Sequence, residues 1–554
     1  MSLKRGRRLA AVELACALAL GVPVGALANS QGNNLAESVQ TKTPIKHVIV
    51  IFGENESFDH YFGTYPYATN PKGEPAFHAL PDTPRANNLL AGGLLDENPN
   101  TTQPFRMDTG KASVTCDQNH SYGPEQAAAD KGLMDKFPES VGSGSSTSSP
   151  CNDYGKGVGV TMGYFDGNTV TAMWNYAQHF AMSDNSYGTM YGPSAVGAIN
   201  LIAGTTAGAT LFPTTPKGTA ASASGSISNG ATTGTVIGDP RPAGDECVLT
   251  NPGLQTTTMV SLAGTNVGDL LNAKHLTWGW FQGGFAPTST NAAGQSVCGA
   301  HHAGLAGDDA VETVGDYIPH HEPFQYFKST QNLHHVQPKD PALIGTSSDG
   351  ANHQYDLSAF WTALGEDRLP SVTYLKAAAY QDGHPGYSDP IDEQAFVVSV
   401  VNAIANSPYW KDTAIILAYD DSDGWYDHVL GPVVNQSAVS DDELLGPGNC
   451  GSGTSATQGR CGYGPRLPLI VISPYAKQNY IDHRLTDQSS ILRFVEDNWD
   501  LGRIGGESAD AKAGTLFGLF DFDDERHAPR LILDPATGVE LNGGSSVTLV
   551  KSSF

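Results

Sequence analysis

Two pairs of oxygen-bearing side chains each come directly after a run of apolar residues. Glu54 and Asn55 follow one run, and Asp420 and Asp421 follow another that lies far along the chain. Carboxylate and amide oxygens are the ligands that hard cations prefer. Because ligand sites of open α/β sheets lie beyond the carboxyl ends of the strands, we expect the two pairs to meet in one metal site. For either pair alone, an acidic turn or a helix cap is the alternative.

The ligand types define the metal only in part. We expect one divalent or trivalent ion, and oxygen donors fit magnesium, calcium, manganese or iron more naturally than a structural zinc site, although zinc stays open. The stretch DDSDG at 420–424 also looks like a calcium-binding loop. Setting Gly424 at the sixth position of such a loop puts Tyr419 first and Leu430 twelfth, where an aspartate and a glutamate are required. The calcium-loop interpretation therefore fails.

Ser194 is the candidate nucleophile, and it lies in the stretch YGPSAVGAIN at 191–200. The Gly-Pro pair before it suits a tight entry into a helix, so Ser194 is expected at the helix start. The free N–H groups and the dipole of a helix start favour a phosphate oxygen there. A serine at this position more often caps the helix, and the local sequence alone favours that simpler role.

Histidines in polar, turn-like stretches are the third element of the candidate site. A single loop histidine is usually just solvated, but several in similar contexts indicate a shared cationic pocket. Two further pairs, His301–His302 and His334–His335, lack such flanking signals and are expected at the surface. The candidates are His120, His320, His321 and His384.

The elements that must position these residues are indicated by apolar patterns. Continuous apolar runs such as HVIVIF and TAIILAY are typical of strands that are buried on both faces of a parallel sheet. Strands are predicted at residues 46–53, 276–281, 413–419 and 467–473, the second being the weakest. Helices are predicted at residues 170–180, 194–203, 358–364, 393–405 and 489–499. This alternation predicts a doubly wound, mostly parallel α/β sheet with helices on both faces.

Composition limits the partners. The chain has 554 residues, a formal net charge of -26 and a pI of about 4.9. Such acidity argues against nucleic acid and against an anionic membrane surface as partners. A small phosphorylated substrate stays compatible, because a bound cation and histidines reverse the potential locally. The oligomeric state is left open.

The first residues are expected to direct export. A basic stretch at 4–8 precedes an apolar stretch at 9–27, and Ala-Leu-Ala at 26–28 forms a cleavage site. We therefore expect a signal peptide at 1–28 and a periplasmic or secreted protein without a stable membrane anchor. An uncleaved anchor is the alternative.

One catalytic domain is predicted at 45–535, with flexible insertions near 141–150 and 217–235, and a C-terminal tail at 536–554. Cysteine use agrees with export, since six cysteines follow the signal peptide. Fifteen pairings are possible, and we expect the pairing of sequence neighbours. These pairs are Cys116–Cys151, Cys247–Cys298 and Cys450–Cys461.

Taken together, the motifs resemble the bacterial phosphoesterase family that contains secreted acid phosphatases and phospholipases C. The resemblance runs from HVIVIFGENESFDHYFGTYP through GPSAVGAINLIAG and YDDSDGWYDHV to CGYGPRLPLIVISPYAK. It implies an alkaline-phosphatase-like α/β fold and Ser194 as the nucleophile. It also implies metal ligands and phosphate-binding histidines at the positions already singled out: Glu54, Asn55, Asp420 and Asp421, and His120, His320, His321 and His384.

Within that family, details of the motifs favour the acid phosphatase branch. Phospholipases C usually carry Glu-Asn-Arg in the first motif and Asp-Glu in the second, whereas here Glu56 and Asp421 take the last positions. Many of them have threonine where Ser194 stands. The sequence thus predicts a phosphate monoesterase acting on small phosphorylated molecules. A phospholipase C or other phosphodiesterase acting on phospholipids is the alternative, and a non-catalytic exported binding protein is a third interpretation.

The expected mechanism begins with in-line attack of Ser194 on phosphorus. A metal beside the hydroxyl oxygen favours the alkoxide and neutralises phosphate charge. Water then hydrolyses the phosphoserine. Protonated histidines would hold phosphate oxygens, and one would protonate the leaving alcohol, so an activity optimum below neutral pH is expected.

Overall fold

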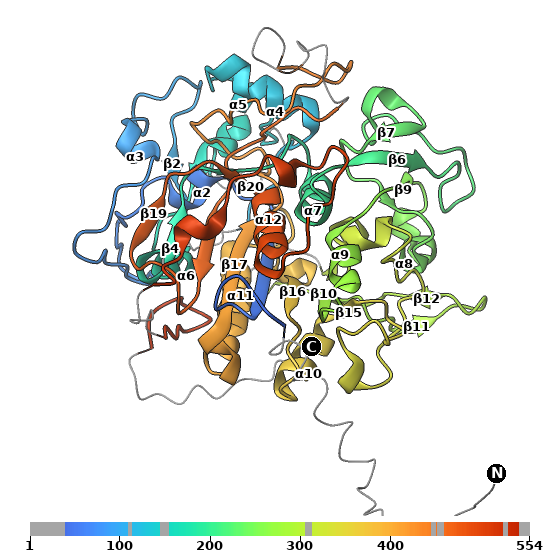
Figure 1. Cartoon of the computed structure of the whole chain (residues 1–554). Coiled ribbons are helices and arrows are strands. Elements are labelled where there is room, and N and C mark those ends of the chain that lie inside the picture. Colours follow the sequence, from blue (N-terminus) through green and yellow to red (C-terminus); the bar gives the residue numbers. More distant parts are fainter. Residues whose placement is uncertain are drawn as a thin grey trace, which may run out of the picture.

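A computed structural model of the chain describes residues 39–108, 114–144, 154–304, 313–444, 450, 459–523 and 530–541. Its centre is an eight-stranded sheet (Figure 1). In spatial order the strands are β15 (Gln354–Asp356), β10 (Trp278–Gln282), β16 (Val372–Lys376), β1 (His47–Gly53), β17 (Thr413–Tyr419), β18 (Leu469–Ile472), β4 (Ala181–Ser183) and β19 (Tyr480–Asp482).

The middle of the sheet is parallel. β1 pairs in parallel with β16 on one side and with β17 on the other, and every residue of β1 is buried. The continuous apolar runs thus form buried central strands, and the predicted α/β fold with a mostly parallel sheet is confirmed. β1 and β17 end together, with Gly53 opposite Tyr419, so the residues that follow them start side by side.

The direction predicted for residues 467–473 is wrong. β18 runs antiparallel to both of its neighbours, β17 and β4. Its apolar run correctly indicated burial on both faces, because all four residues of β18 are buried. A strand covered on both faces needs apolar residues in either direction, so the pattern carries no information about polarity.

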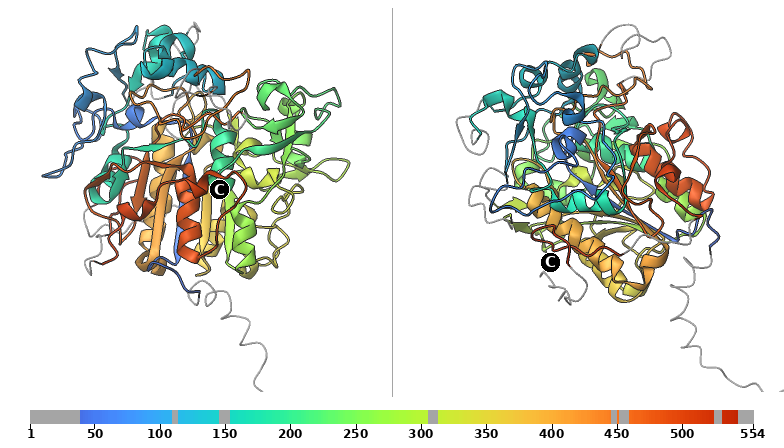
Figure 2. Two further views of the ribbon diagram at one scale, coloured as in Figure 1. Left: turned by 45° about the horizontal axis from the view of Figure 1, so that its top comes forward. Right: turned by 90° about the vertical axis from the view of Figure 1, so that its left-hand side faces the viewer.

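Helices cover both faces of the sheet (Figure 2). α7 packs against α12 on one face, and α11 packs against α6 on the other. All five predicted helices are present: α6 (Thr171–His179), α7 (Ser194–Ala203), α10 (Leu357–Gly365), α11 (Pro390–Ala405) and α12 (Gln488–Trp499). α11 begins at Pro390 rather than at residue 393, because Asp389 caps it by accepting from the backbone N–H groups of Ile391 and Asp392.

A second, four-stranded sheet lies beside the main one (Figure 1). Its order is β7 (Thr233–Thr235), β6 (Ala207–Leu211), β9 (Met259–Leu262) and β8 (Arg241–Pro242). The Ala/Ser/Gly/Thr-rich stretch at 217–235 leads into β7, which is an edge strand of this sheet.

The other helices and strands are short. The helices are α2 (Phe58–Phe62), α3 (Leu89–Gly92), α4 (Tyr122–Ala129), α5 (Phe137–Ser140), α8 (Glu246–Thr250) and α9 (Val267–Ala273). The strands are β2 (Phe105–Arg106), β3 (Gly163–Tyr164), β5 (Ser186–Tyr187), β11 (Ser289–Thr290), β12 (Ser296–Val297), β13 (His301–His302), β14 (Val314–Gly315) and β20 (Thr486–Asp487).

Two of the predicted disulfides are present, Cys247–Cys298 and Cys450–Cys461. Cys116 is also disulfide-bonded, and its predicted partner Cys151 lies outside the described residues.

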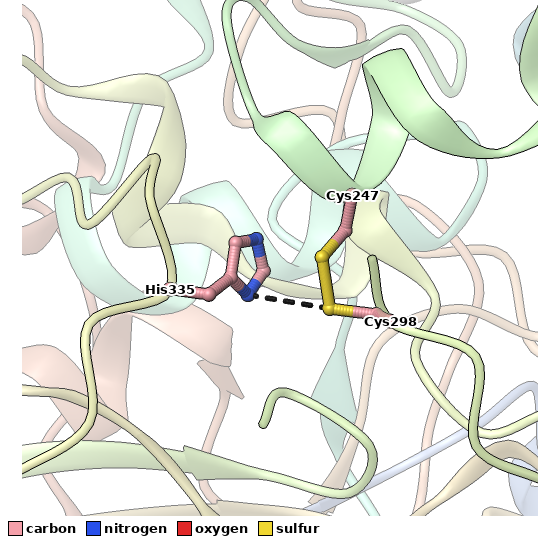
Figure 3. A group of neighbouring side chains, drawn as sticks. All are labelled: Cys247, Cys298 and His335. Carbon is pink, nitrogen blue, oxygen red and sulfur yellow. Dashed lines mark hydrogen bonds between the residues drawn. A yellow bond between two sulfur atoms is a disulfide. The ribbon is translucent and has the colours of Figure 1, made fainter. Parts of the chain in front are cut away.

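One histidine expected at the surface is instead buried. The ring of His335 lies beside the Cys247–Cys298 disulfide (Figure 3). Its Nε2 is 2.9 Å from Asp245 Oδ1, and its Nδ1 is 2.9 Å from the carbonyl oxygen of Phe285. Both ring nitrogens have polar partners, so burial leaves neither unsatisfied. His301, His302 and His334 are exposed, as predicted.

Within the described ranges, no helix is both long enough and apolar enough to cross a bilayer. The predicted signal peptide at 1–28 lies outside these ranges, as do residues 145–150 of the first predicted insertion and residues 542–554 of the predicted tail.

Candidate active site

The two predicted ligand pairs meet at the carboxyl edge of the sheet. Glu54 and Asn55 follow β1, Asp420 and Asp421 follow β17, and all four side chains are buried. The backbone N–H of Asn55 donates to Asp420 Oδ1 at 3.1 Å. Asn55 has a left-handed backbone, with φ of 60°, which asparagine tolerates better than most residues. Its side chain lies between Asp423 and Ser194.

Ser194 is the first residue of α7, and its hydroxyl lies among the ligand pairs. Ser194 Oγ is 3.0 Å from Asp421 Oδ2, 3.1 Å from Glu54 Oε2 and 3.4 Å from Asn55 Oδ1. A hydroxyl has one proton to donate, so it cannot satisfy three acceptor oxygens at once. Oxygen atoms that converge in this way on a buried point fit a cation.

The approach of α7 to the strand end depends on Gly197. A Cβ atom at this position would lie 2.0 Å from the carbonyl oxygen of Asp420. The helix therefore contacts the backbone of the metal-ligand loop directly. Gly192, with φ of 123°, and Pro193 bring the chain into α7 just before Ser194.

Lys376 is a member of the site that the sequence did not indicate. It ends β16, is fully buried, and its Nζ forms an ion pair with Glu54 and lies 3.3 Å from Asp420 Oδ2. Burial alone would lower the pKa of Lys376, but the charges of Asp420 and Glu54 raise it above its usual value. Lys376 is therefore a fixed positive charge among the carboxylates.

The four predicted histidines surround the same point. His321 Nδ1 is 3.1 Å from Glu54 Oε1, and His320 Nε2 is 3.9 Å from Asp239 Oδ1. His120 Nδ1 is 3.1 Å from Asp423 Oδ1, and the ring of His120 meets that of His384 edge to face, with 6.0 Å between centroids. The structure thus brings together all nine predicted site residues.

The pKa values of the histidines shift in different directions. Burial alone would lower the pKa of His120, but the carboxylates of Asp421 and Asp423 raise it well above its usual value. Burial lowers the pKa of His321 well below its usual value, and burial also lowers that of His384. His120 is thus the one of these three that keeps its proton at neutral pH.

Three further acidic residues position the site loops. Asp423 accepts from Asn55 Nδ2 at 3.2 Å, and Asp239 accepts from the backbone N–H of Ala195 at 2.9 Å. Glu125 accepts from Ser422 Oγ at 2.7 Å and from a backbone N–H of the loop that precedes Ser194. Asp423 was visible in the DDSDG stretch, whereas Glu125 and Asp239 lie in stretches without any local signal.

The donor set fits a bound cation. Burial and the charge of Asp420 raise the pKa of Glu54 well above its usual value. Burial raises that of Asp421, with the charge of His120 acting in the opposite direction. Such shifts mean that the carboxylates lack enough positive charge around them, and a metal ion would supply it. Glu54, His321 and Asp382 also place one ligand atom each within 4.8 Å of one another.

The chain matches one protein family and is similar to several bacterial phospholipases C. A family model described as "Phosphoesterase family" matches residues 45–502. The chain is 23% identical over 521 residues to a non-hemolytic phospholipase C of Pseudomonas aeruginosa, covering 92% of this chain and 61% of that protein. It is 24% identical to a non-hemolytic phospholipase C of Burkholderia pseudomallei, covering 82% of this chain and 55% of that protein.

A third relative is phospholipase C A of Mycobacterium tuberculosis, at 23% identity over 82% of this chain and 72% of that protein. The chain thus spans less than two thirds of the length of the first two relatives. Among solved structures, a protein in the alkaline phosphatase superfamily from Vibrio parahaemolyticus matches at 11% identity, covering 75% of this chain and 78% of that chain. Its TM-score of 0.26 is too low to support a conclusion.

Proposed function

The chain belongs to the phosphoesterase family, and we propose that it hydrolyses phosphoric esters with Ser194 as the nucleophile. One observation carries the proposal. The Ser194 hydroxyl lies 3.0–3.4 Å from oxygen atoms of Glu54, Asn55 and Asp421, which come from the ends of two neighbouring central strands. With Asp420, these residues would hold one divalent or trivalent metal ion.

In the proposed reaction, Ser194 Oγ attacks phosphorus in line with the leaving oxygen. A new Oγ–P bond forms as the ester P–O bond breaks, and the leaving alcohol takes up a proton. Water then attacks the phosphoserine, which releases phosphate and restores the hydroxyl. When bound, the metal ion would favour the serine alkoxide and neutralise charge on the phosphate.

His120 is suited to hold a phosphate oxygen, because its raised pKa keeps the ring charged. His321, with a lowered pKa and Nδ1 3.1 Å from Glu54 Oε1, is suited to orient that ligand. The two remaining predicted histidines, His320 and His384, line the same space and are candidates for protonating the leaving alcohol.

Two substrate classes compete. The relatives are named phospholipases C, and these names favour cleavage of phosphodiesters such as phospholipids. The sequence itself predicted cleavage of phosphate monoesters. The motif positions at Glu56, Ser194 and Asp421 instead favour phosphate monoesters. Both classes need the same nucleophile and metal site, so they differ in what the surrounding residues recognise.

Export to the periplasm or the medium is part of the proposal. It is supported by the predicted signal peptide at 1–28 and by the two disulfides, since disulfides persist in oxidising compartments. We also propose that residues 45–535 form one catalytic domain and that residues 536–554 form a tail after it.

The decisive assay compares hydrolysis of p-nitrophenyl phosphate with that of p-nitrophenyl phosphorylcholine. Ser194→Ala is expected to lower kcat for both by about a thousandfold or more, because a nucleophile and the phosphoserine route are lost. The control is Ser348→Ala, which changes an exposed serine. Unchanged turnover in Ser194→Ala would overturn the proposed nucleophile, and full activity after exhaustive removal of metal would overturn the metal site. Turnover of neither ester by the wild-type protein would favour the non-catalytic interpretation.

A further inference from the structure

Arg241 belongs to the second sheet and follows closely after Asp239, which binds the start of α7. It forms β8 with Pro242, and β8 contacts the short turn Pro319–His321, which carries two of the site histidines. Two residues earlier, Asp239 accepts a hydrogen bond from the backbone N–H of Ala195, the residue after the nucleophile. The hydroxyl of Tyr326 donates to the carbonyl oxygen of Pro240 and fixes this segment from the other side.

Two of the three guanidinium nitrogens of Arg241 are buried without a hydrogen-bond partner among the described residues. Its Nε and Nη1 atoms are inaccessible to solvent, and neither has a partner among the residues that the structure describes. A buried N–H group without a partner is costly, and an arginine in this state usually awaits a ligand or a bound water. The arginine fork matches phosphate oxygens well, because two parallel N–H groups can bind two oxygens.

The chain segment that carries Arg241 adjoins both the start of α7 and the site histidines. Asp239 accepts from the backbone N–H of Ala195, and its Oδ1 lies 3.9 Å from His320 Nε2. Burial raises the pKa of Asp239, and the charges of His120 and Arg241 act in the opposite direction. The charge of Arg241 also lowers the pKa of His321. Arg241 is thus close enough to Asp239 and His321 for its charge to act on both, and two of its N–H groups have no partner among the described residues.

We propose that Arg241 binds the phosphate of the substrate and makes the doubly charged phosphate of a monoester a better ligand than the singly charged phosphate of a choline diester. The inference rests on the proposed function, which puts phosphorus at Ser194. A second negative charge gains more from a buried guanidinium than a single one does, and the ammonium of a choline head group is repelled by it. Arg241 therefore selects for monoesters, the class that the names of the relatives do not suggest.

The test measures Arg241→Gln and Arg241→Lys against the wild-type enzyme with its metal bound. Arg241→Gln is expected to raise KM for p-nitrophenyl phosphate and Ki for inorganic phosphate about tenfold or more, the loss of a charge-assisted hydrogen bond. KM for p-nitrophenyl phosphorylcholine is expected to change less than threefold. Arg241→Lys keeps the charge and is expected to recover part of the lost affinity for p-nitrophenyl phosphate and inorganic phosphate. Lys328→Gln, which removes an exposed positive charge, is the matched control.

Two results would overturn the inference. In the first, Ki for inorganic phosphate stays within twofold of wild type in Arg241→Gln. In the second, Arg241→Gln raises KM equally for both substrates, and its midpoint of thermal unfolding falls but recovers in Arg241→Lys. That result would assign Arg241 a structural role.

Calorimetry with inorganic phosphate separates this inference from the proposed function, because it needs no turnover. If the wild-type protein binds phosphate but hydrolyses no ester, the proposed function fails. Weaker phosphate binding in Arg241→Gln would then still support the role of Arg241. If the wild-type enzyme is active and Arg241→Gln binds phosphate equally well, the function stands and the inference falls.

Discussion

Lys376 places a permanent positive charge among the carboxylates of the candidate metal site. Its Nζ forms an ion pair with Glu54 and lies 3.3 Å from Asp420, and all three side chains are buried. When a metal ion is absent, Lys376 is the nearest group that offsets the repulsion between the two acids. The lysine therefore stabilises the metal-free protein, while the ion itself would take over much of that task once bound.

Replacing Lys376 by methionine is expected to destabilise the metal-free protein by about 3–5 kcal/mol, because removal of one partner leaves buried carboxylates uncompensated. Adding metal is expected to raise the midpoint of thermal unfolding more in Lys376→Met than in the wild type. Calorimetric melting with and without a chelator measures both effects. Lys411→Met is the control, since its side chain is 71% exposed. An equal metal-induced shift in both proteins would contradict this role.

Single residues show where sequence reasoning ended. The positions of the two candidate ligand pairs and of Ser194 were predictable, because each stands at the end of a recognisable strand or the start of a recognisable helix. Lys376 and Arg241 were not, because their importance comes from contacts with residues far away in the chain. His335 was misplaced for the same reason. A histidine is polar in sequence, and its burial is favourable here because Asp245 and the carbonyl of Phe285 bind its two ring nitrogens.

At the scale of elements, the contact between α7 and the loop after β17 holds Ser194 against the candidate metal ligands. Gly197 faces the backbone of Asp420, where a Cβ atom would lie 2.0 Å from the carbonyl oxygen. β17 is hydrogen-bonded on both sides, to β1 and to β18, so the strand end has little freedom to move away. Any added atom must therefore displace the helix and Ser194 with it.

Gly197→Ala is expected to lower kcat by about tenfold to a hundredfold, since a displacement near 1 Å at a reacting atom has effects of this order. Overpacking is expected to cost about 1–3 kcal/mol of stability as well. Gly365→Ala is the matched control, because Gly365 also lies in a helix and an added Cβ would meet nothing within 4 Å. Wild-type kcat in Gly197→Ala would show that α7 does not position the nucleophile.

The elements also show which patterns carry information. The five helices were predicted from their apolar patterns, whereas the cap at Asp389, which sets the start of α11, was missed. β16 was missed although it is central, because the stretch VTYLK ends in a charged residue and is short. Its lysine is tolerated inside only because carboxylates of other strands surround it. The antiparallel direction of β18 was not predictable, since burial on both faces does not depend on direction.

At the scale of the whole molecule, one buried polar network links three distant segments. Arg466, just before β18, binds Asp427 with Nε and Nη2 at 3.0–3.1 Å and Asp59 with Nη2 at 3.2 Å. His428 Nδ1 lies 2.5 Å from Asp59 Oδ2. Asp59 follows the first candidate ligand pair and Asp427 follows the second, so the network fixes the two loops that carry these pairs relative to each other.

This network makes stability depend on pH. Burial alone would raise the pKa of Asp59, but the charges of His428 and Arg466 lower it. Its contribution is thus present above the pKa of the unfolded state, near 4, and is lost as the pH falls through the lower folded value. Burial alone would lower the pKa of His428, but Asp59 raises it. That contribution is present below about 6.5 and is lost as the pH rises through the higher folded value.

The pair therefore stabilises the fold most between about pH 4 and pH 6.5. We expect His428→Gln to lower stability by about 1–3 kcal/mol at pH 5.5, the range for a hydrogen bond to a charged group. The difference from wild type should shrink toward pH 8.5, where the wild-type ring loses its proton. Thermal unfolding across this pH range measures it, and His78→Gln, at an exposed position, is the control. A difference that stays constant or grows with pH would show that the imidazolium–carboxylate pair does not hold the two loops together.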